Sequence, residues 1–281
     1  MNIGIIGRGF VGKAVEHCFA QNKNFESKIR IFDKKKELST HSLSEIVKKS
    51  EFIFLSVPTP ANKDGSINLD FVEDALQNIS KISDNNPIIL LRSTVTPGTT
   101  ENFSQKFPNL NIVFNPEFLT ERNANEDFIN QSRIILGGEE ELTRKVAGLY
   151  SSILANDIPI IHTNFETAEF IKYMSNCFLA TKVSFMNEMK LISDVVGADW
   201  EQVVTGFSED ERIGTSHTKV PGHDGKLGFG GSCLPKDIQA LINLSDNLNL
   251  DSKVIKAVWK TNLELRPQKD WEELKSRAVV D

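Results

Sequence analysis

The sequence has little that would build a disulfide-rich or metal-stabilised protein. Its three cysteines, Cys18, Cys177 and Cys233, lie far apart, and their odd number and spacing provide neither a disulfide framework nor a C-x-x-C zinc pair. The five histidines show no H-E-x-x-H spacing. We therefore expect no metal site, and we expect a reduced, cytoplasmic protein.

Long apolar runs and basic stripes are also missing. No segment approaches the ~18–20 consecutive apolar residues that cross a bilayer. The N-terminus opens directly on the strand-like run Ile3–Ile6, without the basic and apolar regions of a signal peptide. The net charge is −6, and Lys34–Lys36 form only a short basic run. Neither a membrane nor a nucleic-acid partner is expected.

The first half of the chain alternates short apolar runs with amphipathic stretches. The runs that predict strands are Asn2–Ile6, Lys28–Phe32, Phe52–Val57, Ile88–Arg92, Ile112–Phe114, Arg133–Leu136 and Pro159–Ile161. The stretches that predict helices are Val11–Gln21, Ser44–Lys49, Leu69–Lys81, Thr99–Lys106 and Glu140–Leu154. Strands that alternate with helices are typical of the α/β class, with a Rossmann-like, doubly wound and mostly parallel sheet.

The pattern changes after His162. From Phe165 to about Val196 there is no proline or glycine, and apolar residues recur at helical spacing, which predicts one helix of about 30 residues. Such a helix is longer than one sheet face needs, so part of it should pack against a second helical domain or another subunit. We expect a homodimer.

The rest of the chain predicts a small all-α domain. Further helices are predicted at Asp199–Thr205, Leu234–Leu248 and Asp251–Leu265, and a long Gly-rich loop at Ile213–Gly231. The expected organisation is an NAD-binding Rossmann domain over residues 1–164, a long connecting helix over 165–196, and a helical substrate or dimerisation domain over 197–281.

A G-x-G-x-x-G sequence follows the first predicted strand and opens the first predicted helix. In such a loop the first glycine permits a tight turn, the second lets the backbone approach a pyrophosphate, and the third lets helix and strand pack closely. The helix N-terminus offers N–H groups to the phosphates. The residues expected to bind the cofactor here are Gly7, Gly9, Phe10, Val11 and Gly12.

Asp33 stands at the end of the second predicted strand, about 20 residues beyond the last glycine, where an acid bonds the adenosine ribose hydroxyls. A carboxylate there repels a 2′-phosphate and favours NAD over NADP. The adjacent Lys34–Lys36 leave NADP open. The alternative is a glycine turn with a solvated aspartate and no cofactor.

Cys233 is the candidate nucleophile. It follows the glycine-rich Gly228–Gly231, and Pro235 suits the first turn of the next helix. A thiol at a helix N-terminus, with Lys236 close by, should have a lowered pKa and attack a carbonyl. An inert buried thiol is the alternative, and it is the reading we apply to Cys18 and Cys177.

Three pairs of polar residues share a spacing of four: Glu117 with Glu121, Lys172 with Asn176, and Cys233 with Asp237. On a helix this spacing places both side chains on one face. Lys172, among apolar neighbours, could stabilise an oxyanion together with the Asn176 amide. Glu117 could act as a general base toward water. A solvated lysine and an exposed turn acid are equally open from spacing alone.

Taken together, these segments resemble the UDP-glucose/GDP-mannose dehydrogenase family. The resemblance rests on motifs in order along the chain: Gly7–Gly12, Val57–Pro60, Arg92–Val95, Asn115–Leu119 with Glu121, Glu169–Tyr173 with Asn176, Arg212–Gly214 and Gly228–Asp237. It implies an NAD-dependent, four-electron oxidation of a primary alcohol of a nucleotide sugar to a carboxylate, resembling UDP-glucose 6-dehydrogenase activity.

The resemblance also implies roles for single residues. Cys233 would form a thiohemiacetal and then a thioester, with Lys172 and Asn176 stabilising oxyanions and Asp237 assisting proton movement. Thr94 would help hold a water, and Glu117 would be the base that activates it. The residues expected against the cofactor are Pro58, Thr59, Glu121 and Lys236. Those expected toward substrate are Arg212, Phe229 and Gly230.

Two other functions remain open. The family resemblance implies a further C-terminal α/β domain, for which the sequence after the helical region shows no third run of strands and helices. A non-catalytic NAD-binding or assembly subunit is therefore one alternative. The other is a two-electron β-hydroxyacid dehydrogenase, which shares the sheet-plus-long-helix plan and needs no nucleophilic cysteine.

Overall fold

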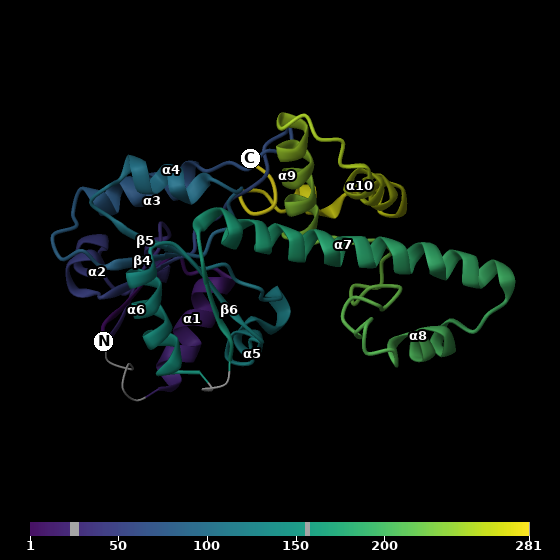
Figure 1. Ribbon diagram of the computed structural model, residues 1–281, viewed down its shortest axis with the longest axis horizontal. Helices are drawn as coiled ribbons and strands as arrows, with labels where there is room; N and C mark the ends of the chain where they lie inside the picture. The colour runs from purple at the N-terminus through teal and green to yellow at the C-terminus, as the bar shows by residue number, and fades with distance from the viewer. Residues whose placement is uncertain (23–27, 155–157, 281) are drawn as a thin grey trace. The chain divides into compact units, whose positions relative to one another are not determined.

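The structure is a computed structural model that describes residues 1–22, 28–154 and 158–280 (Figure 1). The chain divides into two compact units. The first contains Met1–Thr59 and Leu69–Lys172, and the second contains Pro60–Asn68 and Tyr173–Asp281.

The first unit is built on a seven-stranded sheet with the order β2-β1-β3-β4-β5-β6-β7. Its strands are β1 (Ile3–Ile6), β2 (Ile29–Phe32), β3 (Phe52–Leu55), β4 (Ile88–Leu91), β5 (Asn111–Phe114), β6 (Ile134–Gly137) and β7 (Ile160–Thr163). Neighbouring strands run parallel except β5 and β6, which pair antiparallel with Phe114 opposite Gly137. The predicted doubly wound, mostly parallel sheet is confirmed.

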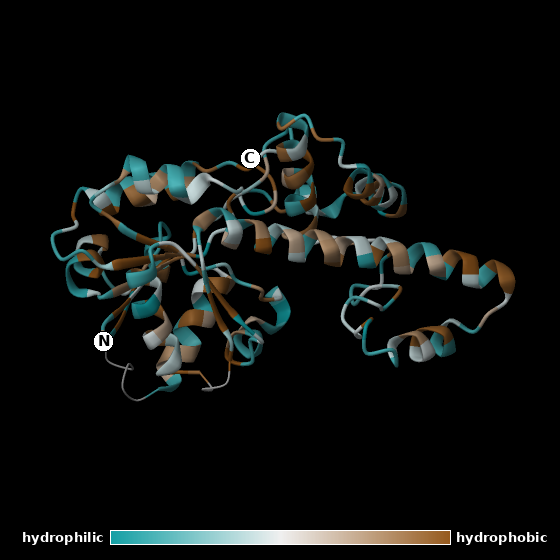
Figure 2. Cartoon of the chain, in the orientation of Figure 1, coloured by the Kyte–Doolittle hydropathy of each residue, from teal (hydrophilic) through white to brown (hydrophobic). Residues whose placement is uncertain are grey.

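Helices cover both faces of this sheet. Successive side chains of a strand point to opposite faces, and because they are apolar on both, each face needs a covering layer. On one face, Ile3 and Ile5 share a core with side chains of α1 (Phe10–Gln21), α5 (Ala124–Ile129) and α6 (Glu140–Ser151). On the other, Ile6 shares a core with α2 (Leu43–Lys49), α3 (Asp70–Ser80), α4 (Thr99–Lys106) and the start of α7 (Phe165–Val196). The strands are accordingly apolar almost throughout, as the brown colouring in Figure 2 shows.

The predicted long helix is confirmed as α7, a single helix over Phe165–Val196. Its residues through Lys172 belong to the first unit, and those from Tyr173 onward belong to the second.

The second unit continues with α8 (Trp200–Ser208), α9 (Leu234–Asn247) and α10 (Lys253–Leu265). Its small core includes Cys177 of α7, Ile238 of α9, Val258 of α10 and Phe229 of the intervening loop. The segment Pro60–Asn68, which joins β3 to α3, also belongs to this unit. Ala61 donates its amide to the carbonyl of Ala278 (2.9 Å), and Val280 donates to the carbonyl of Ala61 (3.0 Å).

The short helix α5 (Ala124–Ile129) was not predicted, since its six residues form too few turns to show a helical period. Across residues 1–22, 28–154 and 158–280, no helix combines the length and the apolar character that a bilayer crossing requires.

Candidate active site

The glycine loop between β1 and α1 has the shape that a pyrophosphate needs. A Cβ on Gly7 would come within 2.3 Å of the Ser56 carbonyl oxygen, and one on Gly12 within 2.0 Å of the Gly7 carbonyl oxygen. At Gly9, by contrast, a Cβ would meet nothing within 4 Å. The first and third glycines thus permit backbone contact, while the second faces open space at the N-terminus of α1.

Asp33 lies next to this loop at the end of β2. Its carboxylate accepts hydrogen bonds from the backbone amides of Arg8 (2.7 Å) and Lys35 (2.9 Å), which fix its orientation. Among the neighbouring cations, the Lys34 ammonium bonds Asp74 (3.0 Å), and the Arg8 guanidinium bonds Glu16. The loop and the acid therefore fit a dinucleotide with a ribose diol, and they favour NAD.

Glu117 and Lys172 form a buried ion pair. Lys172 donates from Nζ to Glu117 Oε1 at 3.0 Å and also to the Glu117 backbone carbonyl. The Glu117 side chain is 6% exposed and the Lys172 side chain is 3% exposed. The second carboxylate oxygen accepts from the Leu119 amide at 2.7 Å. The ion pair thus joins the loop after β5 to the second turn of α7.

Glu117 and Glu121 do not share a helix, contrary to the prediction from their spacing. Residues 115–120 are not helical, and the 3-10 helix begins only at Glu121. Glu117 is buried, whereas Glu121 is exposed.

The loops that follow β3 and β4 are joined by Ser93. Its hydroxyl donates to the Val57 carbonyl (2.7 Å) and accepts from the Val57 amide (3.0 Å). Next to these bonds, Thr59 is buried, Thr94 is half-buried and Pro58 is exposed. Thr94 and Pro58 therefore stand on loops that are held together at the carboxyl edge of the sheet.

Glu169 is a buried acid to which our sequence reasoning gave no role. Its carboxylate accepts from the amides of Gly98 (2.6 Å) and Thr100 (2.8 Å) at the N-terminus of α4. Burial raises the pKa of Glu169 to about 7. The sequence did contain a signal for this residue. Glu169 lies four residues after Phe165 and one after Ala168, both buried, so helical spacing places its carboxylate on the apolar face of the helix.

Cys233 is placed as predicted, in the N-cap position of α9 with Pro235 in the first turn. It is half-buried, whereas Cys18 and Cys177 are buried. Burial raises the pKa of the Cys18 thiol to about 11 and also raises the pKa of Cys177. Of the three thiols, Cys233 is the one that combines access with a helix N-terminus.

Asp237 is the centre of a buried polar cluster in the second unit. Its Oδ1 accepts from Lys236 Nζ (2.5 Å) and its Oδ2 from Asn176 Nδ2 (2.5 Å). All three residues are less than 9% exposed. Asn176, predicted to act beside Lys172, is thus bonded to the carboxylate that follows Cys233 by one helical turn.

The glycine-rich loop before Cys233 is held by polar side chains. Asn262 accepts from the Phe229 amide (2.7 Å) and donates to the Phe229 carbonyl (3.0 Å), and Asn187 accepts from the Gly228 amide (3.1 Å). A Cβ on Gly230 would lie 2.5 Å from the Arg266 guanidinium. Phe229 is itself buried in the core of this unit.

Arg212 lies elsewhere in the second unit. Its guanidinium is 88% exposed and bonds the carboxylate of Asp210. The predicted catalytic residues belong to both units. Glu117 lies in the first unit with Thr94 and Lys172. Cys233 lies in the second unit with Asn176, Lys236 and Asp237.

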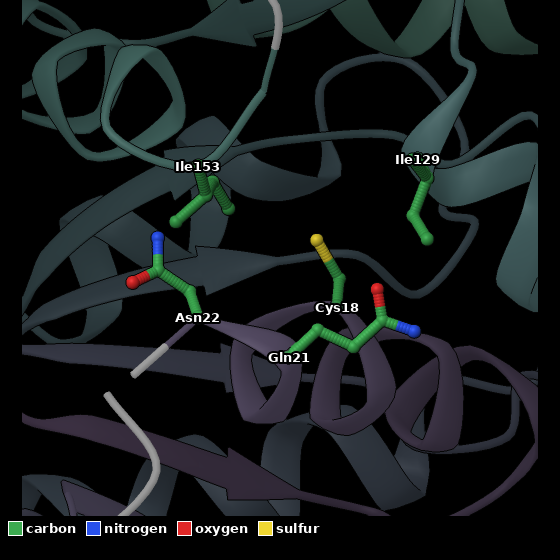
Figure 3. A pocket seen from close by; sticks show the side chains of 5 residues that line it. All are labelled: Cys18, Gln21, Asn22, Ile129 and Ile153. Carbon is green, nitrogen blue, oxygen red and sulfur yellow. The ribbon is translucent and has the colours of Figure 1, made fainter. Parts of the chain in front are cut away.

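A pocket in the first unit lies away from these residues (Figure 3). It is lined by Cys18, Gln21 and Asn22 at the C-terminal end of α1, with Ile129 and Ile153. The cofactor loop stands at the other end of α1, so this pocket is not the dinucleotide site. Within the described part of the chain, no group of three or more His, Cys, Asp or Glu could hold a metal ion.

The fold and the glycine loop define a dinucleotide-binding Rossmann protein with a helical second unit. Residues 28–154 match the NAD binding domain of the UDP-glucose/GDP-mannose dehydrogenase family, and residues 166–264 match its central domain. The chain belongs to this family, and the prediction of NAD as cofactor is confirmed.

Relatives agree with this assignment. UDP-glucose 6-dehydrogenase of Rickettsia bellii is 34% identical over 94% of this chain and 67% of its own length. UDP-glucose 6-dehydrogenase YwqF of Bacillus subtilis is 33% identical over 93% of this chain and 66% of its own. Across the curated relatives compared, the chain spans 50% to 68% of their length.

Solved structures show the same fold. UDP-glucose dehydrogenase from Pyrobaculum islandicum has a TM-score of 0.81 and 29% identity, over 95% of this chain and 68% of that one. 3-Hydroxyisobutyrate dehydrogenase of Mycobacterium tuberculosis has a TM-score of 0.75 over 95% of this chain and 94% of that one. Its identity is 13%, so that likeness concerns the fold alone.

Proposed function

We propose that this protein oxidises the primary alcohol of a nucleotide sugar, such as UDP-glucose, to the carboxylate in two NAD-dependent steps, with Cys233 as nucleophile. The observation that carries the proposal is the accessible thiol at the start of α9, one turn before a carboxylate held by two buried donors. Overall, one alcohol, two NAD+ and one water give one carboxylate, two NADH and three protons. The glycine loop and Asp33 would hold NAD, which would supply the hydride acceptor for each oxidation.

In the first half of the reaction, the alcohol loses a proton and a hydride to become an aldehyde. The Cys233 thiolate then adds to the aldehyde carbon, forming a C–S bond, and the oxygen takes up a proton to give a thiohemiacetal. Asp237 is our candidate for moving these protons, since it stands one helical turn beyond Cys233. Its bonds to Asn176 and Lys236 fix its orientation.

In the second half, the thiohemiacetal loses a hydride and a proton to become a thioester, and water hydrolyses it. Glu117 is the proposed base for the attacking water, with Thr94 holding that water. The attack breaks the C–S bond and returns the electron pair to Cys233. Lys172, paired with Glu117 at 3.0 Å, supplies the fixed positive charge beside the developing oxyanion.

We also propose that a second copy of the chain is the partner of α7. In the second unit, this helix exposes Met174, Phe178 and Phe185, and Val195 near its end is 88% exposed. Figure 2 shows brown over this C-terminal part of the helix. A helix face of this kind can pair with itself about a two-fold axis. Light scattering should show a dimer that Phe178→Glu converts to monomers; a monomeric wild type would refute the pairing.

The function is tested by mixing purified protein with NAD and a panel of nucleotide sugars and polyols while following NADH absorbance. We expect two NADH per substrate. Cys233→Ala should abolish acid formation, whereas the control Cys18→Ala should retain it. Full acid formation by Cys233→Ala would refute the mechanism.

The alternatives give different results in the same assay. A two-electron β-hydroxyacid dehydrogenase would form a single NADH per substrate and tolerate alkylation of Cys233. A binding or assembly subunit would bind NAD without turnover. Mass spectrometry after brief iodoacetamide treatment at neutral pH should find Cys233 modified ahead of Cys18 and Cys177, whose pKa values are raised by burial.

A further inference from the structure

The N-terminus of α4 lacks a cap of its own. Thr96-Pro97-Gly98-Thr99 forms a tight turn in which Thr99 donates its amide to the Thr96 carbonyl (3.0 Å), and Gly98 adopts a left-handed φ of 90°. Glycine suits that conformation but has no side chain with which to satisfy the first amides of the helix. The amides of Gly98 and Thr100 therefore need an acceptor from elsewhere in the chain.

Glu169 supplies that acceptor from α7. Each of its carboxylate oxygens accepts one of the two amides, at 2.6 and 2.8 Å, and the residue is 0% exposed. The partners are 71 and 69 positions away in the sequence, so the contact joins two separate elements. The partial positive charge at the N-terminus of α4 favours the carboxylate.

Two loops of the first unit are thus attached to adjacent turns of the same helix. Glu169 holds the loop after β4, which carries Thr94 four residues before Gly98. Lys172, three residues further along α7, holds Glu117 in the loop after β5. The residue proposed to hold the water and the residue proposed to activate it are therefore located by one stretch of α7.

We propose that Glu169 is a positioning residue for thioester hydrolysis, which it supports by fixing the Thr94 loop relative to the Glu117–Lys172 pair. This inference rests on the proposed function. Glu169 makes no contact with the glycine loop or with Cys233 among its hydrogen bonds. It should therefore affect hydrolysis while leaving NAD binding and both oxidations intact.

The charge state of Glu169 provides a second signature. Burial is the main cause of its pKa of about 7, and the charged group acting on it is Glu166 on the same helix, while the α4 side presents Gly98 and Thr100. An ionised carboxylate accepts both amides. A protonated one keeps one carbonyl acceptor and places a hydroxyl against the other amide, so the attachment of the loop should weaken as the pH falls below about 7.

The test compares Glu169→Gln with Glu166→Gln, the same change three residues earlier at an exposed position of α7. Rapid mixing with NAD and the nucleotide sugar should give Glu169→Gln a burst of two NADH per site at a rate within twofold of wild type. The slow phase that follows should be about 10- to 100-fold slower, by loss of a charge-assisted hydrogen bond. The KM for NAD should stay within twofold. The comparison is made at pH 8, above the pKa of Glu169, where the loss of the Glu166 charge leaves Glu169 ionised and Glu166→Gln should behave as wild type.

Hydrogen exchange gives a readout without substrate. The Gly98 and Thr100 amides should exchange faster in Glu169→Gln than in wild type or Glu166→Gln. If Glu169→Gln does not fold, the wild type itself supplies the test: as the pH falls from 8 to 6, the Gly98 and Thr100 amides, which donate to Glu169, should lose exchange protection relative to the Phe107 amide at the other end of α4. The proposal is overturned if the slow phase is unchanged, if burst and slow phase fall together, or if Glu166→Gln shows the same loss.

Failure of the proposed function looks different. In that case wild type forms no NADH with any nucleotide sugar, although the exchange difference between Glu169→Gln and Glu166→Gln persists. A missing exchange difference, with normal wild-type turnover, would refute the role of Glu169 alone.

Discussion

One methyl group, added at two positions of the cofactor loop, should separate cofactor binding from folding. At Gly9 the added Cβ meets nothing within 4 Å, and φ is −71°. Gly9→Ala should therefore lower the free energy of unfolding by only about 0.5–1 kcal/mol, the cost of replacing glycine by the poorer N-cap alanine. The methyl would occupy the space into which the pyrophosphate must come. Loss of one charge-assisted hydrogen bond from the loop costs about 1.5–3 kcal/mol, so the Kd for NAD should rise about 10- to 150-fold.

At Gly12 the same methyl would lie 2.0 Å from the Gly7 carbonyl oxygen. Backbone cannot yield as a flexible side chain does, so Gly12→Ala should lose about 1–3 kcal/mol of folding stability or more. Calorimetric NAD titration and urea unfolding followed by circular dichroism measure the two effects on each variant. Wild-type NAD affinity in a folded Gly9→Ala protein would refute the placement of the pyrophosphate at this loop.

Three further predictions concern charged groups. Lys172→Met leaves the Glu117 carboxylate buried without its cation and should lower the free energy of unfolding in urea by about 3–5 kcal/mol. Most of that loss should be recovered when Glu117→Gln is added. Equal losses in the single and double variants would contradict the pairing. The hydrogen bond from Arg266 lowers the pKa of Asp270 to about 2, below its unfolded value, so this group stabilises the protein above about pH 4, and the contribution disappears as the pH falls toward 2. In Asp270→Asn, the fall in the free energy of unfolding between about pH 4 and pH 2 should be smaller than in wild type by up to about 2 kcal/mol, as measured by unfolding followed by tryptophan fluorescence. An unchanged fall would contradict the assignment of this pH dependence to Asp270. Asp33→Ser should weaken NAD binding about tenfold and narrow the preference over NADP in the same titration; an unaltered NAD affinity would show that the ribose lies elsewhere.

The architecture was largely predictable because its signals are local. Apolar runs between turn residues predicted the strands, and 32 residues without glycine or proline predicted α7. Strand direction carries no such local signal, so the reversal between β5 and β6 was not predicted. With β6 antiparallel, the chain needs no crossover helix after Phe114, and the short α5 stands in that connection.

The site was predictable one residue at a time but not as a set of contacts. Cys233 at a helix start and the glycine loop depend on neighbouring residues, and the structure places both as predicted. Spacing paired Glu117 with Glu121, whereas Glu117 bonds Lys172, 55 positions away. Such long-range partners follow from tertiary packing, which a single sequence does not display.

The excursion Pro60–Asn68 has a practical consequence for dissecting the molecule. The backbone of Ala61 bonds Ala278 and Val280, and the Asp64 carbonyl accepts from Asn243 (3.2 Å), so the second unit is assembled from two stretches of chain. A fragment that starts at Tyr173 would leave these donors and acceptors in water. Expression of this unit by itself would therefore require the nonapeptide to be grafted on, for example through a short linker to the residues around Val280.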